Sequence, residues 1–354
     1  MREVNIAVIG ATGAVGMEFL RILEERQFPA DHIRLTASQR SVGKRIPVRG
    51  QELVVQATGP ESLEGVDIAF ISATSRVSLE MGAAAVEAGA LAIDDSSAFR
   101  MRPDVPLVVP EVNGEDVEWH QGIIAIPNCA TTPLVMAAQP LHRHNPVSRI
   151  VASTYQSVSG AGGAAMTELR EQTRGAFQGG APPPQAQPHQ IAFNVIPRID
   201  DFGPDGYTKE ETKVREETRK IMHSPGLAVA ATCVRVPVYV SHSAAVHMEF
   251  QHPMDADEAR GILAEAPGIT VVDAPEEGLY PMPVDVGGTD DVYVGRIRKD
   301  TSHPNGLVMW VVADNLRKGA ALNAIQIAEE VLKRDCLKPG GKAAVAAASQ
   351  SLND

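Results

Sequence analysis

The stretch Val4-Asn5-Ile6-Ala7-Val8-Ile9-Gly10-Ala11-Thr12-Gly13-Ala14-Val15-Gly16 decides the fold class of this 354-residue chain. Its apolar beginning is typical of a buried strand, and the helical pattern after the glycines continues to about Arg26. Glycines in such a turn let the backbone approach a pyrophosphate, and the helix N-terminus supplies N–H donors. The spacing is GxxGxxG and not GxGxxG, so a plain glycine-rich turn is the alternative. The flanking strand and helix favour a dinucleotide site lined by Gly10, Thr12, Gly13, Ala14, Val15 and Gly16.

Strands and helices alternate over the first 127 residues. Further apolar strands are predicted at residues 33–36, 67–71, 91–93 and 123–126, and a helix is predicted through Met81 to Ala88. This alternation is typical of a parallel, doubly wound sheet in an α/β protein. Residues 1–127 are therefore predicted to form a Rossmann-like dinucleotide-binding domain.

Beyond residue 127 the predicted strands become longer and richer in valine. They lie at residues 149–157, 228–236, 244–250, 291–297 and 307–313, with helices at 163–177 and 209–222. This pattern favours a mixed or antiparallel sheet in an α+β domain over residues 128–314. The proline-rich residues 179–190 are expected to form a stiff loop that lies over another surface or subunit.

The last part of the chain returns to an amphipathic helical pattern. Residues 315–332 predict a helix, extending to about residue 336, that packs back onto the first domain and makes that domain discontinuous. Residues 338–354 are small and polar, and we expect them to form a frayed tail without function.

Composition limits the class of protein and its partners. The residues are 44% hydrophobic and 21% charged, and the length suits about two domains. A formal charge of −12 argues against nucleic acid or an anionic membrane as the main partner. No apolar run approaches the roughly 18 residues of a membrane span, and residues 1–9 do not form a signal peptide. Three widely spaced cysteines form no disulfide framework and fit a reducing cytoplasm.

The end of the second predicted strand indicates the cofactor. An NAD site usually places Asp or Glu there to bind the ribose hydroxyls. Here the strand runs into Thr36-Ala37-Ser38-Gln39-Arg40-Ser41, which has no carboxylate. Arg40 with Ser38 and Ser41 suits a 2′-phosphate, so we expect NADP; a solvated loop with an ordinary surface arginine is the alternative. Asp31 precedes the predicted strand and is discounted.

A cysteine begins an apolar, helix-like run in Ile126-Pro127-Asn128-Cys129-Ala130-Thr131-Thr132-Pro133-Leu134. Thr131 or Thr132 is expected to cap that helix, and Pro133 fits its first turn. The helix N-terminus favours the thiolate of Cys129, which attacks carbonyl carbon; a buried structural cysteine is the alternative. Asn128 could bind a substrate or a developing oxyanion, and a plain turn role is its alternative. With the nucleotide turn, the motif indicates a thiol-dependent, nicotinamide-linked dehydrogenase.

Polar residues elsewhere could complete such a site. A histidine that exchanges protons with the thiol is needed, but the residue pattern does not rank His242 above His247 or His252. Glu210 and Lys213 share one helix face, where composition alone favours a surface ion pair. The histidines show no metal-ligand spacing, so no metal is expected.

Several motifs together resemble those of aspartate-semialdehyde dehydrogenases, most of all the bacterial branches. They are residues 10–16, 37–41, 97–100, 127–132, 156–160, 210–213, 235–238 and His242, and the resemblance covers the chain to about Cys336. It implies the conversion of β-aspartyl phosphate and NADPH into aspartate β-semialdehyde, NADP⁺ and phosphate. It also implies a place in lysine, methionine and threonine biosynthesis and a homodimer or dimer of dimers.

The resemblance also implies roles for individual residues. Cys129 forms the thioester, and His242, seven residues after Arg235, exchanges protons with a pKa near its ordinary value of about 6.5. Glu210 contacts the substrate amino group, with Glu211 close enough for a one-residue misassignment. The remaining substrate contacts are Gln156 and Asn128 at the reacting centre, Arg235 at the α-carboxylate, and Arg100 and Lys213 at the phosphate. The positions near the nicotinamide half are Thr74, Ser159, Gly160 and Asn315.

Three other functions remain as alternatives. An N-acetyl-glutamyl-phosphate reductase shares the chemistry, but its substrate has no free amine to engage Glu210 and its cysteine motif differs. Glyceraldehyde-3-phosphate dehydrogenases fit the Arg40 loop and the cysteine motif less well. A non-catalytic homologue would have lost the nucleophile, the base or the anion-binding arginines, all of which are present here.

Overall fold

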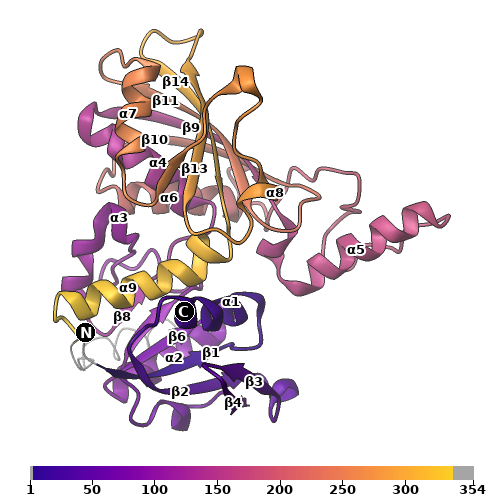
Figure 1. Ribbon diagram of the computed structural model, residues 1–354, viewed down its shortest axis with the longest axis vertical. Helices are drawn as coiled ribbons and strands as arrows, with labels where there is room; N and C mark the ends of the chain where they lie inside the picture. The colour runs from indigo at the N-terminus through magenta and orange to yellow at the C-terminus, as the bar shows by residue number, and fades with distance from the viewer. Residues whose placement is uncertain (1–2, 338–354) are drawn as a thin grey trace. The chain divides into compact units, whose positions relative to one another are not determined.

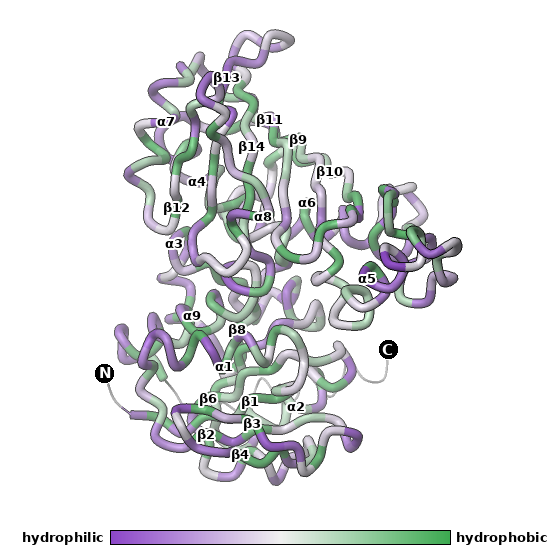
Figure 2. The backbone as a smooth tube through the Cα atoms, turned by 45° about the vertical axis from the view of Figure 1, so that its right-hand side comes forward, coloured by the Kyte–Doolittle hydropathy of each residue, from purple (hydrophilic) through white to green (hydrophobic). Residues whose placement is uncertain are grey.

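The computed structural model describes residues 3–337 and divides into two compact units. The first unit comprises the chain up to Pro127 and from Ala320 onward, and the second comprises Asn128–Gly319. Figure 1 shows a twisted sheet in each unit, and Figure 2 shows hydrophobic stretches along β1 and β6 of the first. Within residues 3–337, no helix is long and apolar enough to span a membrane. The tail predicted at residues 338–354 lies outside the described residues.

The first unit contains a parallel six-stranded sheet with the order β5-β2-β1-β6-β7-β8. Its strands are β1 (Val4–Ile9), β2 (Ala30–Ala37), β5 (Gln56–Ala57), β6 (Ile68–Ile71), β7 (Leu91–Asp94) and β8 (Ile123–Ala125). Its helices are α1 (Ala14–Glu25), α2 (Ser75–Glu87), the short α3 (Pro110–Asn113) and α9 (Leu322–Lys333). The order reverses between β1 and β6, which is the arrangement that the alternating pattern predicts. The predicted α/β class with a Rossmann-like sheet is confirmed.

The second strand differs from its prediction. It spans Ala30–Ala37 and not residues 33–36, so Asp31 lies inside β2 rather than before it. Asp31 is exposed near the start of the strand, away from the end where a ribose-binding carboxylate is needed. A hairpin of β3 (Arg45–Val48) and β4 (Gln51–Val54) was not predicted. Its two-residue turn, Arg49-Gly50, has positive φ at both positions, a hairpin geometry that Arg-Gly does not signal clearly.

The final helix begins later than predicted. Regular α-helix starts at Leu322 and not at Asn315, because residues Arg317–Ala321 form a π-helical turn. The Asp314 side chain accepts the N–H groups of Leu316 and Arg317, and this local turn delays the helix. The apolar face of α9, including Ile325 and Val331, belongs to the same buried core as β1 and α1. The last helix thus completes the core of the first unit.

The glycine turn between β1 and α1 is fixed by close backbone contacts. Gly10 has φ +88°, and a Cβ there would lie 2.0 Å from the carbonyl oxygen of Ser72. A Cβ on Gly16 would lie 2.3 Å from the carbonyl oxygen of Gly10. These two positions therefore require glycine: a side chain at Gly10 would collide with the backbone after β6, and one at Gly16 would push α1 away from the turn.

The second unit is built on a mixed six-stranded sheet with the order β10-β9-β11-β14-β13-β12. Its strands are β9 (Val147–Gln156), β10 (Ala228–Arg235), β11 (His242–Phe250), β12 (Ile269–Val271), β13 (Val292–Lys299) and β14 (Gly306–Ala313). The end pairs β9–β10 and β12–β13 are parallel and the central pairs are antiparallel, which confirms the predicted mixed sheet.

One face of this sheet is covered by helices (Figure 1). They are α4 (Thr131–His144), α6 (Lys209–Ile221) and α7 (Ala256–Ala264), while the short α8 (Pro283–Val286) contacts β14. Helix α5 (Gly163–Phe177) has the predicted bounds and projects from the sheet with a small apolar cluster of its own. The proline-rich residues after it form no helix or strand, as predicted.

Candidate active site

A pocket in the first unit gathers the residues that were predicted to bind a nucleotide. It has a volume of about 690 Å³ and lies where β1, β2 and β6 end, beside the reversal of strand order. Its lining includes Gly10, Thr12, Gly13, Ser38, Arg40, Ser72 and Thr74. Ala14, Val15, Gly16 and Ser41 adjoin these residues in the chain but do not line the pocket.

The two predicted parts of this pocket contact each other directly. The Thr12 hydroxyl donates to the Ser41 hydroxyl over 3.2 Å, which ties the glycine turn to the arginine loop. Arg40 lies exposed in a 3₁₀ turn over Gln39–Ser41. Glu80 is the one carboxylate among the lining residues, and the first turn of α1 has no acidic residue. The pocket therefore presents N–H donors and a guanidinium, which suits a phosphate-bearing ligand.

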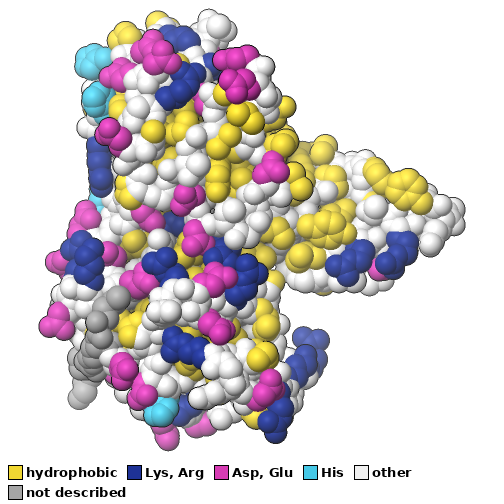
Figure 3. Space-filling model, viewed as in Figure 1, with side chains coloured by type: hydrophobic (Ala, Val, Ile, Leu, Met, Phe, Trp, Pro, Cys, Tyr) yellow, Lys and Arg dark blue, Asp and Glu magenta, His cyan; other side chains and the backbone are white. Residues whose placement is uncertain are grey.

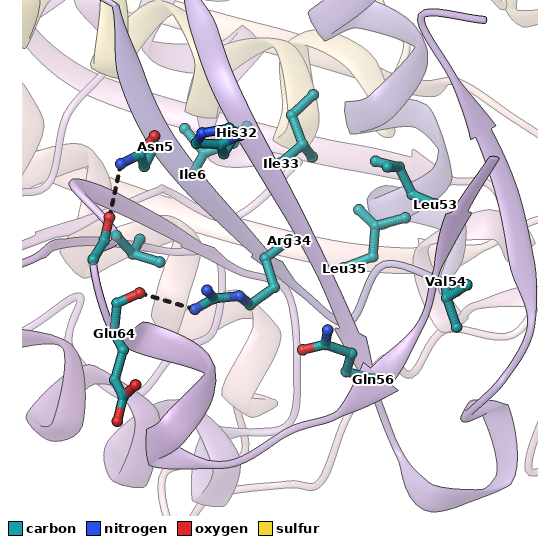
Figure 4. Close-up of a pocket in the computed structure, with 12 residues that line it drawn as sticks. Asn5, Ile6, His32, Ile33, Arg34, Leu35, Leu53, Val54, Gln56 and Glu64 are labelled. Atoms are coloured by element: carbon teal, nitrogen blue, oxygen red, sulfur yellow. Dashed lines mark hydrogen bonds between the residues drawn. The ribbon is translucent and has the colours of Figure 1, made fainter. Parts of the chain in front are cut away.

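A second pocket of the first unit, of about 540 Å³, lies along the early part of β2 (Figure 4). Arg34 on its wall donates to the backbone oxygens of Ser62 and Glu64, at 2.6 and 3.1 Å. Asn5 similarly donates to the carbonyl of Gly65. Ligands of doubly wound sheets bind at the carboxyl ends of the strands, and this pocket lies elsewhere, so the Gly10–Arg40 pocket is the nucleotide candidate.

Arg100 also lies in the first unit. It is buried, and its Nη2 donates to the backbone oxygen of Asp95 over 2.7 Å. The loop that precedes it is held by Asp94, whose carboxylate accepts the backbone and hydroxyl hydrogens of Ser96. Burial raises the pKa of Asp94, although these hydrogen bonds and the Arg100 charge oppose the shift.

In the second unit, Cys129 lies just before α4. Its neighbour Ala130 is the N-cap residue, so the expected threonine cap is wrong: Thr131 and Thr132 are the first helical residues. No side chain caps this end of α4; Asn128 precedes it, and its Oδ1 accepts the N–H of Ala130 at 2.8 Å. Its backbone oxygen accepts the N–H groups of both threonines. Pro133 lies in the first turn, as predicted.

The structure brings His242 to this cysteine. Its Nε2 lies 3.3 Å from Cys129 Sγ, whereas His247 is partly exposed beside Asp300. His242 is the first residue of β11 and is buried. Burial and, secondly, the Arg235 guanidinium lower its pKa well below 6.5, against a weaker effect of the Ser241 backbone. The expected pKa near the ordinary value is therefore wrong.

Asn315 connects the segments behind this histidine. Its Oδ1 accepts the Ser157 and Ser159 hydroxyls, at 3.0 and 2.9 Å, and the Ser241 N–H at 3.0 Å. Ser157 and Ser241 were not among the predicted site residues. The sequence pointed to Ser157 only through its place in residues 156–160, one of the motifs that resemble the family.

The Glu210 carboxylate joins three other predicted residues. Its Oε1 accepts Asn128 Nδ2 at 2.9 Å and Gln156 Nε2 at 3.0 Å, and its Oε2 accepts Lys213 Nζ at 3.2 Å. Burial opposes ionisation, but the Lys213 charge and these hydrogen bonds hold the pKa of Glu210 below its ordinary value. Burial likewise opposes the charge on Lys213, whose pKa is raised by Glu210 and Asp200.

The neighbouring Glu211 has a structural role. It forms a capping box with Thr208, and its Oε1 accepts the backbone N–H of Cys233. Glu210 is therefore the carboxylate that contacts Gln156 and Asn128. This geometry favours Glu210 over Glu211 for the predicted contact with the substrate amino group.

Arg235 ends β10 beside the histidine. Its Nη1 donates to the Ser157 backbone oxygen over 2.7 Å, and burial lowers its pKa. A Cβ on Gly160 would lie 3.1 Å from His242 Nε2 and 3.2 Å from Arg235 Nη1. Glycine at position 160 therefore leaves space beside the polar atoms of both side chains. A buried guanidinium beside a thiol and an imidazole can hold a carboxylate next to a reacting carbonyl.

The three cysteines differ in access and chemistry. Cys129 is partly exposed, whereas Cys233 and Cys336 are buried. Burial raises the pKa of the Cys233 thiol to about 12, so it is protonated at neutral pH. No cluster of three His, Cys, Asp or Glu side chains that could hold a metal occurs in the part of the chain that the structure describes.

We expect Glu210→Gln to destabilise the protein in a pH-dependent way. The folded state lowers the pKa of Glu210, so its stabilising effect is present above about pH 4.5 and is lost as the pH falls through the folded value. Urea unfolding at pH 7 should show a loss on the order of 2 kcal/mol, and the difference from wild type should shrink as the pH falls below about 4.5.

Glu216→Gln is the matched control because Glu216 lies on the same helix, half exposed beside Arg215 and Arg219. Its unfolding free energy should change by less than about 1 kcal/mol. Equal losses in the two variants, or a loss in Glu210→Gln that does not vary with pH, would contradict the buried ionised network.

Comparison with known proteins agrees with the motifs. The family model described as "Semialdehyde dehydrogenase, NAD binding domain" matches residues 5–120, and "Semialdehyde dehydrogenase, dimerisation domain" matches residues 138–318. The aspartate-semialdehyde dehydrogenase of Aquifex aeolicus is 52% identical over 334 residues, 93% of this chain and 98% of that protein. The Bacillus subtilis protein of the same name is 48% identical over 340 residues, 94% and 98% of the two chains.

Solved structures give the same result. Aspartate semialdehyde dehydrogenase II of Vibrio cholerae, complexed with ASA, matches with a TM-score of 0.92 and 44% identity, over 94% of this chain and 99% of that one. The Candida albicans enzyme with NADP matches with a TM-score of 0.75 and 26% identity, over 95% and 100%. The family that the sequence motifs predicted is confirmed: this chain belongs to the aspartate-semialdehyde dehydrogenases.

Proposed function

We propose that the chain converts β-aspartyl phosphate into aspartate β-semialdehyde through a thioester on Cys129, with NADPH as reductant. The observation that carries this proposal is the 3.3 Å contact between Cys129 Sγ and His242 Nε2 at the start of α4, in a chain of this family. The product feeds lysine, methionine and threonine biosynthesis. We place the reaction in the cytoplasm, where a catalytic free thiol persists.

Different residues of the second unit contact different groups of the substrate. Cys129 attacks the acyl carbon and phosphate leaves, while Arg235 pairs with the α-carboxylate. A carboxylate has about four acceptor positions, and Glu210 uses three, so a substrate amine fits the fourth. Asn128 and Gln156, both bonded to Glu210, hold that carboxylate toward the reacting centre.

The phosphate is assigned to two cations. Lys213 donates to Asp200 at 2.9 Å and to Glu210, which leaves the third hydrogen of its ammonium for phosphate. Arg100 of the first unit is the second proposed contact. The bound nicotinamide supplies the hydride, with Thr74, Ser159, Gly160 and Asn315 assigned to its half of the cofactor.

The reaction can be tested in the reverse direction by nicotinamide absorbance. We expect purified protein to reduce NADP⁺ with aspartate semialdehyde only when phosphate is present, because phosphate must release the acyl group from sulfur. Cys129→Ser should abolish this activity, and Cys233→Ser should retain it, since the Cys233 thiol is buried and protonated. Turnover of N-acetyl-glutamate semialdehyde instead would move the assignment to the related reductase, and inactivity with both would favour a non-catalytic protein.

Preference for NADP over NAD is tested at the arginine loop. Arg40 is exposed on the wall of the nucleotide pocket, and we propose that it pairs with the 2′-phosphate. Arg40→Ala should raise the KM for NADPH by about tenfold or more and leave the NADH reaction nearly unchanged, because NADH lacks that phosphate. Equal losses with both cofactors would show that the loop does not read the 2′-phosphate.

The match to a dimerisation domain indicates that the chain forms oligomers. We propose a homodimer, or a dimer of dimers, that uses the sheet face of the second unit opposite α4, α6 and α7. Tyr155 and Trp310 lie 5.3 Å apart between ring centroids on β9 and β14, and Tyr155 is 39% exposed. Hydrophobic side chains gather on the visible face of this unit (Figure 3), and Pro281 and Met282 join Trp310 in lining a pocket of about 320 Å³.

Tyr155→Glu should shift the sedimentation-equilibrium mass toward that of a monomer, because a buried carboxylate would oppose the apolar contact. Trp119→Glu is the control, since Trp119 is similarly exposed in the first unit, outside the matched dimerisation region. A Tyr155→Glu protein that keeps the wild-type mass would exclude this face.

A further inference from the structure

The chain between β14 and α9 contains a wider turn than a regular α-helix. The Gly319 N–H donates to the backbone oxygen of Asp314, five residues earlier, over 3.1 Å. This hydrogen bond has the i→i+5 spacing of a π turn, and it leads into the π-helical turn Arg317–Ala321. Such turns are rare and occur frequently at functional sites, and residues 314–319 of this one belong to the second unit.

Gly319 packs directly against the residue that carries the nucleophile. A Cβ on Gly319 would lie 3.0 Å from Cys129 Cβ, 3.3 Å from its Cα and 3.4 Å from its backbone oxygen. All three nearest atoms therefore belong to Cys129. The φ angle of Gly319 is not positive, so its backbone conformation does not require glycine. Since glycine weakens a helical turn relative to alanine, the contact with Cys129 is what explains glycine at this position.

The Asp314 side chain anchors this turn through both of its oxygens. Oδ1 accepts the N–H groups of Leu316 and Arg317, at 2.8 and 3.2 Å. Oδ2 accepts the N–H of Gly288, in the loop after α8, at 2.7 Å. Because Asp314 is buried, these hydrogen bonds are shielded from water and hold the turn firmly to the neighbouring loop.

A second contact joins the same turn and loop. Arg317 Nε donates to Asp290 Oδ1 over 2.8 Å, and Arg317 Nη2 lies 2.7 Å from the same oxygen. Arg317 is buried and Asp290 is half exposed, so the pair closes the loop from its solvent side. Residues 314–319 are therefore held by a loop that contributes no predicted site residue.

The same segment contacts the chain that carries His242. Asn315 Oδ1 accepts the N–H of Ser241, the residue directly before His242, at 3.0 Å. Gly319 lies against Cys129 at the other end of the segment. Cys129 and His242 come from the starts of α4 and β11, 113 positions apart in the chain. Residues 314–319 thus contact both of the segments that meet at the 3.3 Å pair.

We propose that residues 314–319 set the distance between Cys129 Sγ and His242 Nε2, with Gly319 and Asp314 as positioning residues. Gly319 determines how closely Cys129 packs, and Asp314 holds Gly319 in place. A misplacement of about 1 Å at a reacting group can cost about a hundredfold in rate, so such support matters for the thiol chemistry. The inference rests on the proposed function for its kinetic tests but not for its structural test.

The first test is Gly319→Ala, which adds a methyl group where Cys129 lies. We expect kcat for aspartate semialdehyde to fall by about tenfold or more, while its KM changes by less than about threefold. Gly261→Ala is the matched control, because Gly261 lies in α7 and a Cβ there would meet no atom within 4 Å. The control should keep the wild-type kcat. A wild-type kcat in Gly319→Ala, or a change confined to KM, would overturn the proposal.

The structural test needs no substrate. In a crystal structure of full-length Gly319→Ala, Cys129 should have moved by a few tenths of an ångström, and the distance from Sγ to Nε2 should exceed the 3.3 Å of the wild type. An unchanged distance would contradict the inference. Wild-type protein without dehydrogenase activity would refute the proposed function instead, and this distance would still decide the inference.

Asp314→Asn tests the anchor without adding bulk. Asparagine keeps an acceptor for Leu316 but sets an NH2 group against the Gly288 N–H, so the turn should lose its hold on the loop. We expect kcat to fall by about threefold or more with little change in KM. Asp300→Asn is the control, because Asp300 accepts the Ser302 N–H in the same local manner before the opposite end of β14. Equal kcat values in Asp314→Asn and its control would show that the anchor does not position the thiol.

The two substitutions should not be additive, because both act through the same turn. Once Asp314→Asn has released the turn, Gly319→Ala should cost less in kcat than it does in the wild-type background. A double variant whose loss equals the product of the two separate losses would mean that the residues act independently. Urea unfolding first verifies that each variant is folded, and Asp314→Asn with its control decides the question if Gly319→Ala does not fold.

Discussion

The hydrogen bond from Asn128 Nδ2 to Glu210 Oε1, 2.9 Å long and buried, is the contact on which the rest of the second unit's site depends. Through its other atoms, Asn128 accepts the Ala130 N–H just before α4 and donates its backbone N–H to Glu217 of α6. The residue before the nucleophile therefore joins two helices. Since Glu210 also accepts from Gln156, the same carboxylate sets the end of β9. Because Cys129 follows Asn128 directly in the chain, this bond helps to set the position of the nucleophile.

This unit buries two kinds of ionisable group, a charged pair and a single histidine. Glu210 and Lys213 are paired, and each raises the tendency of the other to stay charged despite burial. Such a pair costs desolvation free energy, and only well-directed hydrogen bonds offset that cost. His242 contacts no carboxylate among its hydrogen-bond partners, and burial and the Arg235 charge lower its pKa. The site thus combines a paired charge network around Glu210 with a buried histidine beside the sulfur.

The sequence was sufficient for most strands of both six-stranded sheets, because hydrophobic runs and their spacing carry that information directly, but the short strands β5 and β12 were missed. It was not sufficient for the start of α4, because the Asn128 backbone oxygen accepts the N–H groups of Thr131 and Thr132 and both threonines lie inside the helix without capping it. The π-helical turn at Arg317–Ala321 was missed for a similar reason, since the Asp314 side chain competes with regular helix. The surroundings of His242 are formed by Ser157, Arg235 and Asn315, which lie far apart in the chain. Periodicity and motif spacing do not predict that these distant residues become neighbours in the fold.

The contribution of α9 to the core of the first unit has a consequence for biosynthesis on the ribosome. The parallel sheet is made first, but the helix that covers its apolar residues emerges only after the whole second unit has been translated. Until then, core residues such as Ile93 and Val108 lack the part of their shared core that α9 supplies, which includes Ile325 and Val331. The nascent first unit therefore exposes apolar surface throughout the synthesis of the second, and a growing chain of this design depends on protection from aggregation during that interval.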